Sequence, residues 1–337
     1  MTTIALGAIS SCQPQTSNRE TSTSNQTDCR TIEHEAGETE VCGQPQRIVV
    51  LGSNSLETLL SLNVQPVAFA DIAALHQGDY DQPSQQIPYL GDRIEQSIAN
   101  VGTASNPSIE AIAGVQPDLI IGSSSLNSQQ YETFSQISPT LLLEWTETET
   151  NLKAIAQAVN RTPQAEQLLE ETEQKIAAAR EAFTALTEPY PQVALITTSN
   201  LQEMWINTKA DGLCASLIEE LGFQLVFPPG LNSNDASSSA PLSLEILPQL
   251  NNADLVILLG YNFSDLKQLQ SMDRFENHQL SKLKQAWEEN AIAQSLDASQ
   301  AGRVYFLTTY LCRGLPGPIG TELFLEELKQ QLLTDPS

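Results

Sequence analysis

The chain of 337 residues carries 41 acidic and 16 basic side chains, which gives a net charge of −25, and 40% of its residues are hydrophobic. This length suggests two domains or one large one, and the acidic balance argues against partners that reward Lys and Arg, namely nucleic acid and anionic membrane surfaces. A strongly acidic surface favours a soluble monomer, and no apolar run approaches the roughly 18 residues needed to span a bilayer.

The first twelve residues resemble the end of a bacterial lipoprotein signal. They are mostly small or apolar and finish on Ile9-Ser10-Ser11-Cys12, which makes Cys12 the expected lipidation site. Residues 13–28 contain no large apolar side chain and cannot contribute to a core. We therefore expect a tether that holds a periplasmic domain at a bacterial membrane. The alternative is a ragged terminus with an incidental cysteine.

Four further cysteines remain, an even number of the kind an oxidising compartment favours. Cys29 and Cys42 flank a segment whose polar and apolar residues alternate around Ala36-Gly37. That pattern predicts a hairpin whose ends meet, and hence a disulfide. A second disulfide, between Cys214 and Cys312, is predicted partly because these two cysteines remain once Cys29 and Cys42 are paired. Zinc is the competing use of cysteine, but neither a CxxC spacing nor a nearby His supports it.

From residue 46 onward, short apolar strands alternate with amphipathic helices. Strands are expected at 47–52, 67–71, 118–122 and 140–145, with a helix at 55–63. Apolar runs this short, bounded by Gly, Asn and Ser, are typical of parallel strands buried on both faces.

The longest predicted helix covers residues 164–186, where apolar side chains recur at helical spacing. Pro189 and Pro191 end it. The strand pattern then resumes at 193–198, 254–260 and 304–309. The sequence therefore predicts an α/β fold of two halves joined by one long helix.

Two segments, one in each half, resemble one another: SIEAIAGVQPDLII (108–121) and SLEILPQLNNADLVIL (243–258). In each, a Ser stands two residues before a Glu, and an Asp later opens an apolar run. The Ser can cap a helix, and Glu110 and Glu245 would then lie in its first turn, where the helix dipole favours a carboxylate. A good helix start is the simplest explanation of both glutamates.

Several stretches, in order and spacing, resemble the class III periplasmic solute-binding proteins, the iron-siderophore, haem and cobalamin receptors of ABC importers. They include PQRIVVLG, IPYLGDRI, NVGTASNPSIEAIAGVQPDLIIG, AGRVYFLTTY and GPIGTELFLEELKQQL. The resemblance extends over residues 29–333 and is nearest to cyanobacterial ferric-siderophore or ferric-citrate binding lipoproteins.

This resemblance implies two Rossmann-like lobes with mostly parallel sheets, an N-terminal lobe (29–160) and a C-terminal lobe (189–337). One rigid connecting helix (161–188) joins them, and ligand lies in the cleft between. It also implies that Glu110 and Glu245, one on each lobe, dock with arginines of the membrane permease. No cofactor is expected, and iron would arrive only inside an organic chelate.

Ligands of open α/β sheets bind beyond the carboxyl ends of the strands. Aromatic and polar residues at those ends are the expected contacts, with arginines for the carboxylates of a chelate. The candidates are Asn54, Arg93, Ser124, Trp145, Trp205, Tyr261, Tyr310 and Arg313. Trp287, on a helix, is expected in a core. One or two arginines in a nearly neutral cleft favour ferric citrate or a citrate-hydroxamate chelate over a multiply charged catecholate.

Four other functions compete with capture of a ferric chelate. Haem or cobalamin could occupy the same fold. Direct metal binding would need clustered ligands, but His34, His76 and His278 are dispersed. An α/β hydrolase or reductase acting on the chelate is the rival enzyme, yet the chain has no GxSxG elbow, P-loop or dinucleotide fingerprint. A purely structural surface lipoprotein is the remaining possibility.

Overall fold

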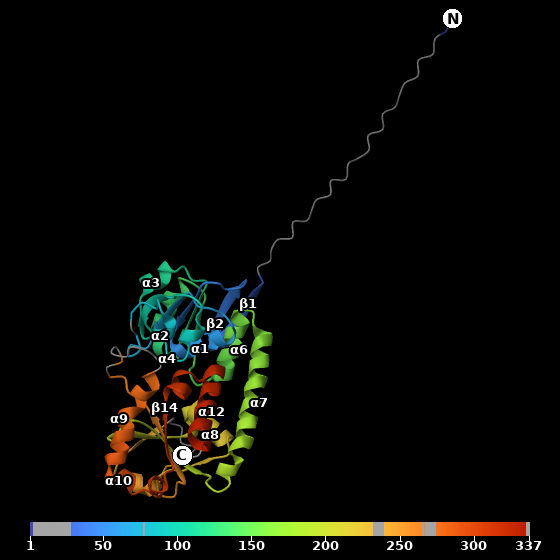
Figure 1. Cartoon of the computed structure of the whole chain (residues 1–337). Coiled ribbons are helices and arrows are strands. Elements are labelled where there is room, and N and C mark those ends of the chain that lie inside the picture. The colour runs from blue at the N-terminus through green and yellow to red at the C-terminus, as the bar shows by residue number, and fades with distance from the viewer. Residues whose placement is uncertain (3–27, 77, 232–238, 265, 267–273, 335–337) are drawn as a thin grey trace.

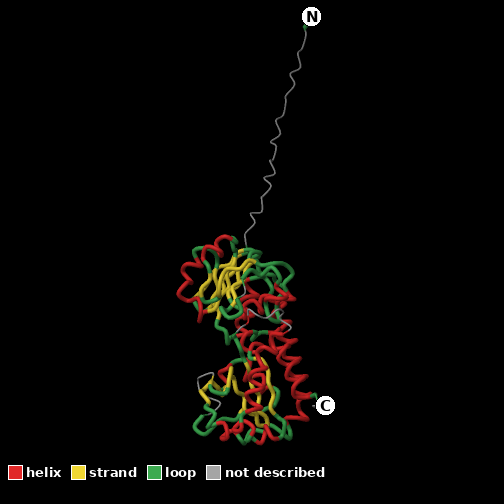
Figure 2. Tube along the Cα trace, turned by 60° about the vertical axis from the view of Figure 1, so that its left-hand side comes forward, coloured by secondary structure: helices red, strands yellow, loops and turns green. Residues whose placement is uncertain are grey.

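The computed structural model describes residues 1–2, 28–76, 78–231, 239–264, 266 and 274–334. They form two α/β lobes, one above the other in Figure 1, with the long helix α7 along the side of both. In the view of Figure 2, each lobe has its own group of strands surrounded by helices and loops. Cys12 and residues 13–27 of the predicted tether lie outside the described residues. No helix in the described part of the chain is long and apolar enough to cross a membrane.

The first described element is an antiparallel hairpin of β1 (Cys29–His34) and β2 (Gly37–Cys42). Cys29 and Cys42 face each other in its register, and a disulfide with an S–S distance of 2.01 Å joins them. Ile32 and Val41 are buried in the core of the first lobe. The hairpin is therefore part of that lobe.

The first lobe is built on a six-stranded sheet in the order β6-β5-β4-β3-β7-β8. All neighbouring strands are parallel except β5 and β6. The strands are β3 (Ile48–Leu51), β4 (Ala68–Asp71), β5 (Ala99–Thr103), β6 (Asn106–Pro107), β7 (Leu119–Ser123) and β8 (Thr140–Leu143). Successive residues such as Val49 and Val50 belong to separate apolar clusters. Since side chains alternate between the faces of a strand, both faces are covered, which explains the unbroken apolar runs.

Short helices surround this sheet. They are α1 (Ser53–Ser61), α2 (Pro83–Gln86), α3 (Ile109–Gly114), α4 (Ser124–Asn127), α5 (Tyr131–Ser135) and α6 (Thr148–Ala158). Of these, α1 directly follows β3, so its first residues lie at the carboxyl end of a central strand.

The second lobe also has a six-stranded sheet, in the order β12-β10-β9-β13-β14, with β11 paired to β9. The strands β9 (Gln192–Asn200), β13 (Leu255–Gly260) and β14 (Val304–Thr308) are parallel and match the predicted runs. The other strands are β10 (Glu203–Asn207), β11 (Gln224–Leu225) and β12 (Ser239–Leu242). Strand β10 pairs antiparallel with β9, and β12 pairs antiparallel with β10 at the edge of the sheet. The sequence pattern does not predict these two strands. The helices of this lobe are α8 (Leu213–Glu220), α9 (Phe275–Glu289), α10 (Ala291–Gln294), α11 (Asp297–Gln300) and α12 (Pro318–Leu333).

Helix α7 (Thr162–Thr187) connects the lobes. Ala165, near its start, is buried in the core of the first lobe. Ala179 and Phe183, near its end, are buried in the core of the second. One continuous helix thus contributes to both cores, as the apolar spacing of residues 164–186 predicted.

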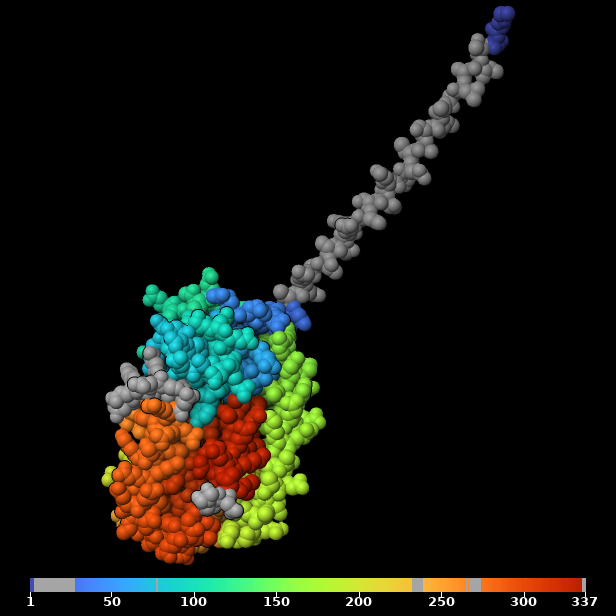
Figure 3. All heavy atoms as spheres, viewed as in Figure 1, coloured from blue at the N-terminus to red at the C-terminus, as the bar shows by residue number. Residues whose placement is uncertain are grey.

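A second connection is made by the C-terminal part of the chain. Tyr310, Leu315 and Ile319 come after the last strand of the second lobe, yet they pack in the core of the first. In the space-filling view the C-terminal residues (red) lie directly beneath the first lobe (cyan) and beside α7 (green) (Figure 3). The lobes therefore touch over a broad area next to the long helix.

The fully buried carboxylate of Glu57, on α1, stabilises this contact between the first lobe and the C-terminal segment. It accepts hydrogen bonds from the backbone N–H groups of Gly317, at 2.7 Å, and Gly320, at 3.0 Å. Both lie at the start of α12, where free N–H groups and the helix dipole favour a carboxylate. A Cβ atom at Gly317 would stand 2.7 Å from a Glu57 oxygen, so a larger residue here would displace the Glu57 carboxylate.

The two similar segments fold differently. In the first, Ser108 caps α3 by accepting a hydrogen bond from the N–H of Ala111, and Glu110 lies in the first turn. In the second, a turn leads into the short 3-10 helix η4 (Leu247–Leu250). The prediction of an α-helix over the second copy is therefore wrong. Pro248 supplies the reason, because it has no N–H to donate to the carbonyl of Leu244.

Candidate functional site

A pocket of about 520 Å³ lies where the carboxyl ends of the strands of both lobes meet. The first lobe supplies residues that follow β3, β4, β7 and β8, and the second supplies residues of β9, β10 and β12 and residues after β13 and β14. The lining residues are Gly52, Ser53, Asn54, Ile72, Ser123, Ser125, Leu126, Trp145, Thr197, Trp205, Ser239, Tyr261, Phe263, Gln279, Thr309, Tyr310, Arg313 and Gly314. The rule for open α/β sheets thus predicted the location.

Large apolar side chains are unusually exposed around this pocket. Trp205 and Phe263 are each 41% exposed, and Leu126 is 42% exposed. The rings of Tyr261 and Phe263 lie 5.7 Å apart. Exposed apolar surface gathered in one concave place is typical of a binding site.

Arg313 is the charged residue of the pocket wall. It lies in the helical turn η7 (Tyr310–Gly314), directly after β14. Its Nε donates to Oδ1 of Asp211 at 3.0 Å, and its Nη2 donates to the same oxygen. The guanidinium carbon lies 5.8 Å from the ring centroid of Trp145, which belongs to the first lobe. Arg313 therefore connects a buried acid of one lobe with an aromatic ring of the other.

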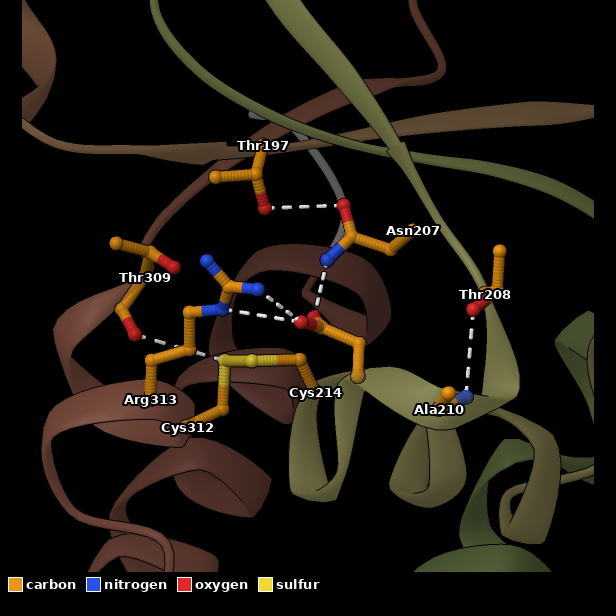
Figure 4. Close-up of polar contacts among 9 residues, drawn as sticks. Thr197, Asn207, Thr208, Ala210, Cys214, Thr309, Cys312 and Arg313 are labelled. Carbon is orange, nitrogen blue, oxygen red and sulfur yellow. Dashed lines mark hydrogen bonds and ion pairs between the residues drawn. A yellow bond between two sulfur atoms is a disulfide. The ribbon is translucent and has the colours of Figure 1, made fainter. Parts of the chain in front are cut away.

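Asp211 is fully buried and belongs to a chain of polar contacts (Figure 4). The hydroxyl of Thr197, on β9, donates to Oδ1 of Asn207 at 2.9 Å, and Nδ2 of Asn207, on β10, donates to Oδ2 of Asp211. Burial raises the pKa of Asp211, while Arg313 and Asn207 oppose that rise by stabilising the carboxylate. Both oxygens of Asp211 thus accept hydrogen bonds, and the bonds to Oδ1 fix the position of the Arg313 guanidinium.

The disulfide Cys214–Cys312 joins the same two segments as this ion pair (Figure 4). Cys312 is the neighbour of Arg313, and Cys214 follows Asp211 by three residues. Their Cα atoms are 5.0 Å apart, and both side chains are fully buried. A covalent bond and a charged contact therefore set the position of Arg313 together.

The first lobe faces Arg313 with small polar groups. Ser53 donates through its hydroxyl to the carbonyl of Gly314 at 3.1 Å, which links the lobes beside the pocket. Ser123 and Ser125 share a hydrogen bond of 2.8 Å. The chain turns sharply at Gly52, whose φ of 116° favours glycine. This turn places Asn54 at the pocket wall.

A second buried carboxylate, Asp71, ends strand β4 one residue before Ile72 of the pocket. Its Oδ1 accepts a hydrogen bond of 2.7 Å from the N–H of Ile72, but Oδ2 has no hydrogen-bond partner among the described residues. Desolvation raises its pKa to about 7. The buried hydroxyls of Tyr80 and Tyr310 also lack partners within the described chain.

The structure brings six of the eight predicted ligand residues to the pocket: Asn54, Trp145, Trp205, Tyr261, Tyr310 and Arg313. Arg93 is not among them. It is exposed in the short 3-10 helix η1 (Gly91–Arg93), and its carbonyl accepts a hydrogen bond from Gln65, which precedes β4. Arg93 therefore lies toward the amino ends of the strands, away from the pocket.

Ser124 also turns away from the pocket, because its hydroxyl donates to the carbonyl of Leu143 and to the carboxylate of Glu144. Its neighbours Ser123 and Ser125 line the wall instead. Trp287 is buried in the second lobe, as expected.

The sequence did not indicate Asp211 or Phe263. Asp211 precedes Arg313 by 102 residues, and no local pattern marks it. Phe263 had a usable signal, since it follows Tyr261 just beyond the strand at 255–260.

Glu110 and Glu245 are exposed and are not among the residues that line the pocket. Helix α3 lies at the upper end of the first lobe in Figure 1. Helix η4, which follows Glu245, packs against α10 at the lower end of the second. Helices α3 and η4 thus lie toward opposite ends of the molecule. A hydrogen bond from its own N–H, and a second from the hydroxyl of Ser243, lower the pKa of Glu245.

Metal ligands do not gather at the pocket among the described residues. Elsewhere in the described chain, on the β1–β2 hairpin, Cys29, Glu40 and Cys42 are close enough to share an ion, but a disulfide joins the two cysteines. The histidines are apart: His34 is on β1, His76 follows β4, and His278 is on α9.

A family model described as periplasmic binding protein matches residues 48–311. Among curated relatives, YhfQ of Bacillus subtilis (strain 168), named as an ABC transporter substrate-binding lipoprotein, is 24% identical over 89% of this chain and 88% of its own length. The Fe(3+)-citrate-binding protein YfmC of the same organism is 31% identical over 48% of this chain and half of its own length. The ferric enterobactin-binding periplasmic protein FepB of Escherichia coli O6:H1 is 24% identical over 79% of this chain and 80% of its own length.

Solved structures share the fold. Staphylococcus aureus SirA complexed with staphyloferrin B superposes with a TM-score of 0.71 at 21% identity, covering 90% of this chain and 98% of that one. FeuA from Bacillus subtilis complexed with ferri-bacillibactin gives a TM-score of 0.67 at 19% identity, over 90% of this chain and all of that one.

Proposed function

The chain belongs to the periplasmic binding protein family, and we propose that it captures a ferric siderophore or a similar iron chelate between its lobes. It then delivers the chelate to the permease of an ABC importer. Iron reaches the protein only inside the chelate, so the protein needs no metal ligands of its own. Its role is binding and delivery rather than catalysis.

The pocket supports this proposal best. It combines an arginine held at the wall, exposed aromatic rings and a set of hydroxyl and amide groups, all at the carboxyl ends of strands from both lobes. A siderophore complex presents iron-bound oxygens and apolar arms. Arginine and hydroxyl donors suit the oxygens, and aromatic faces suit the arms. The relatives named for ferric citrate and ferric enterobactin support the same ligand class.

The proposal extends to the cell envelope. Cys12 would carry a lipid, and the polar residues after it would form the tether. Glu110 and Glu245 would meet arginines on the two halves of the permease. Helix α3, which carries Glu110, and helix η4, which follows Glu245, lie toward opposite ends of the molecule, and this suits a partner that spans both lobes.

Tryptophan fluorescence tests the proposal directly, because Trp145 and Trp205 line the pocket while Trp287 is buried elsewhere. Titration with ferric siderophores should quench the emission and saturate. Replacing Arg313 with Gln should weaken binding by about 2 kcal/mol or more, which is about thirtyfold in Kd. Arg93→Gln is the matched control, since that arginine lies outside the pocket, and it should bind as the wild type does.

Three outcomes separate the rival functions. Tighter binding of haem or cobalamin than of every ferric siderophore would show that the ligand belongs to another class. Chemical change of the recovered chelate, measured by mass spectrometry, would indicate an enzyme. Quenching by no ligand of any class would leave a structural surface protein.

A further inference from the structure

We propose that Asp211 sets the charge of the chelate that this pocket accepts, and that the ligand is a hydroxamate-type ferric chelate with at most one excess negative charge. This inference rests on the proposed function and names the ligand class within it. The observation behind this inference is the ion pair between Asp211 and Arg313 at the pocket wall.

The first step is the charge of the pocket. Among the described lining residues, Arg313 is the single side chain with a full charge. That charge is matched by Asp211, which is fully buried and has no other cationic partner within the described part of the chain. The described wall is therefore electrically neutral as a whole.

The second step is what Arg313 still has to offer. A guanidinium carries five N–H donors, and Asp211 takes one from Nε and one from Nη2. In Figure 4 the remaining nitrogen of Arg313 points away from the carboxylate of that ion pair. The Arg313 side chain is 34% exposed. One edge of the guanidinium is thus available, enough for a single carboxylate or iron-bound oxygen.

The third step is the cost of a highly charged ligand. A charge that leaves water without a partner is strongly unfavourable. Three hydroxamates neutralise a ferric ion, and a chelate of two hydroxamates and one α-hydroxycarboxylate leaves one excess negative charge. Three catecholates leave three. The neutral wall suits the first two and opposes the third.

The rest of the lining agrees with this assignment. Ser53, Asn54 and Ser125 offer uncharged polar groups to neutral iron-bound oxygens. Trp205, Phe263 and Leu126 offer exposed apolar surface for the aliphatic arms of a hydroxamate chelate. Among the described residues, charge selection then depends on the ion pair of Arg313 and Asp211 at the wall.

The test compares two probes, ferrichrome (a neutral trishydroxamate) and ferric enterobactin (a tris-catecholate). The wild type should bind ferrichrome at least about tenfold more tightly, the effect of about 1.4 kcal/mol. Asp211→Asn keeps the size of the side chain but leaves Arg313 with an unmatched charge. The ratio of the two Kd values should then shift at least tenfold toward enterobactin. Arg313→Gln, which leaves Asp211 unmatched instead, should shift the ratio the other way.

Glu219→Gln is the matched control. It removes one negative charge from α8, where Glu219 pairs with Lys209 outside the pocket, and should leave the ratio unchanged. If Asp211→Asn weakens both probes by the same factor, Asp211 acts only as a structural support and the inference fails. Equal binding of both probes by the wild type, or preference for enterobactin, would overturn the ligand class while the proposed function stands. Binding of no ferric chelate would overturn both.

Discussion

Asp71 and Glu57 are both fully buried, yet their surroundings differ. Glu57 shares its two oxygens between two backbone N–H groups. Asp71 has one oxygen bound and one without a partner in the described chain. Desolvation raises the pKa of each to about 7. Asp71 is the simpler case because no neighbour compensates its second oxygen.

Replacing Asp71 with Asn should stabilise the protein above neutral pH. The folded-state pKa of about 7 exceeds the ordinary pKa of 3.8 for an aspartate, so the stabilisation from the bound proton is fully present below about pH 4. It is lost as the pH rises through 7. Each pKa unit corresponds to about 1.4 kcal/mol, and the melting temperature of the wild type should fall by several degrees between pH 5 and 8. Asp71→Asn should remove much of this fall.

The control for this melting series is Asp92→Asn, which changes an exposed carboxylate. Its melting curve should follow the wild type at every pH. Equal pH dependence in Asp71→Asn and the wild type would show that Asp71 ionises in the folded protein without cost.

Residues that line the pocket were predictable where they lie just beyond the carboxyl end of a predicted strand. Trp145, Tyr261 and Tyr310 lie within two residues of such an end, so the rule for parallel sheets selects them. Arg93 does not line the pocket, because its loop returns toward the amino ends of the strands. Asp211 could not be found, since its role depends on a contact across 102 residues.

At the level of elements, the buried parallel strands were predictable, whereas the antiparallel strands β10 and β12 of the second lobe were not. Strands β3, β9 and β13 are buried on both faces and read as unbroken apolar runs. Strand β10 alternates buried and exposed residues, and β12 contains Pro241. Proline is tolerated at a sheet edge, but in a sequence it argues against a strand.

The turns that carry Glu110 and Glu245 lead to a prediction about transport. Reversing both charges, Glu110→Arg with Glu245→Arg, should leave the Kd for the ferric chelate unchanged and abolish most uptake of radioactive iron by cells. Both side chains are exposed and neither lines the pocket. Charges at the edge of an interface set orientation and association rate more than affinity.

The comparison for this uptake assay is Glu132→Arg, which reverses an exposed carboxylate in the first turn of α5. A charge reversal against a helix dipole costs roughly 0.3–1 kcal/mol, and this variant should show that loss without a loss of uptake. Normal uptake by the double variant would contradict the docking role of both glutamates. Their role would then be to stabilise the first turns of the segments in which they lie.

Considered as a whole, the molecule should close only slightly on its ligand. Helix α7 contributes to both cores, and its hydrogen bonds run through the junction between the lobes. Glu57 and Ser53 add contacts from the first lobe to the C-terminal segment. Small-angle scattering profiles with and without ferric chelate should therefore be nearly superimposable. A contraction of several ångströms in the radius of gyration would contradict this prediction, and the iron-free chelator serves as the control.

The bond between Glu57 and Gly317 also bears on how the protein is made. The two residues are 260 positions apart, and the core of the first lobe includes Ile319. A ribosome releases the first lobe long before the residues that complete it. Until almost the whole chain has emerged, Glu57 lacks these partners and the core of that lobe is incomplete. A chain that must cross a membrane unfolded gains from such a delay, because its earliest part cannot lock into its final shape on the wrong side.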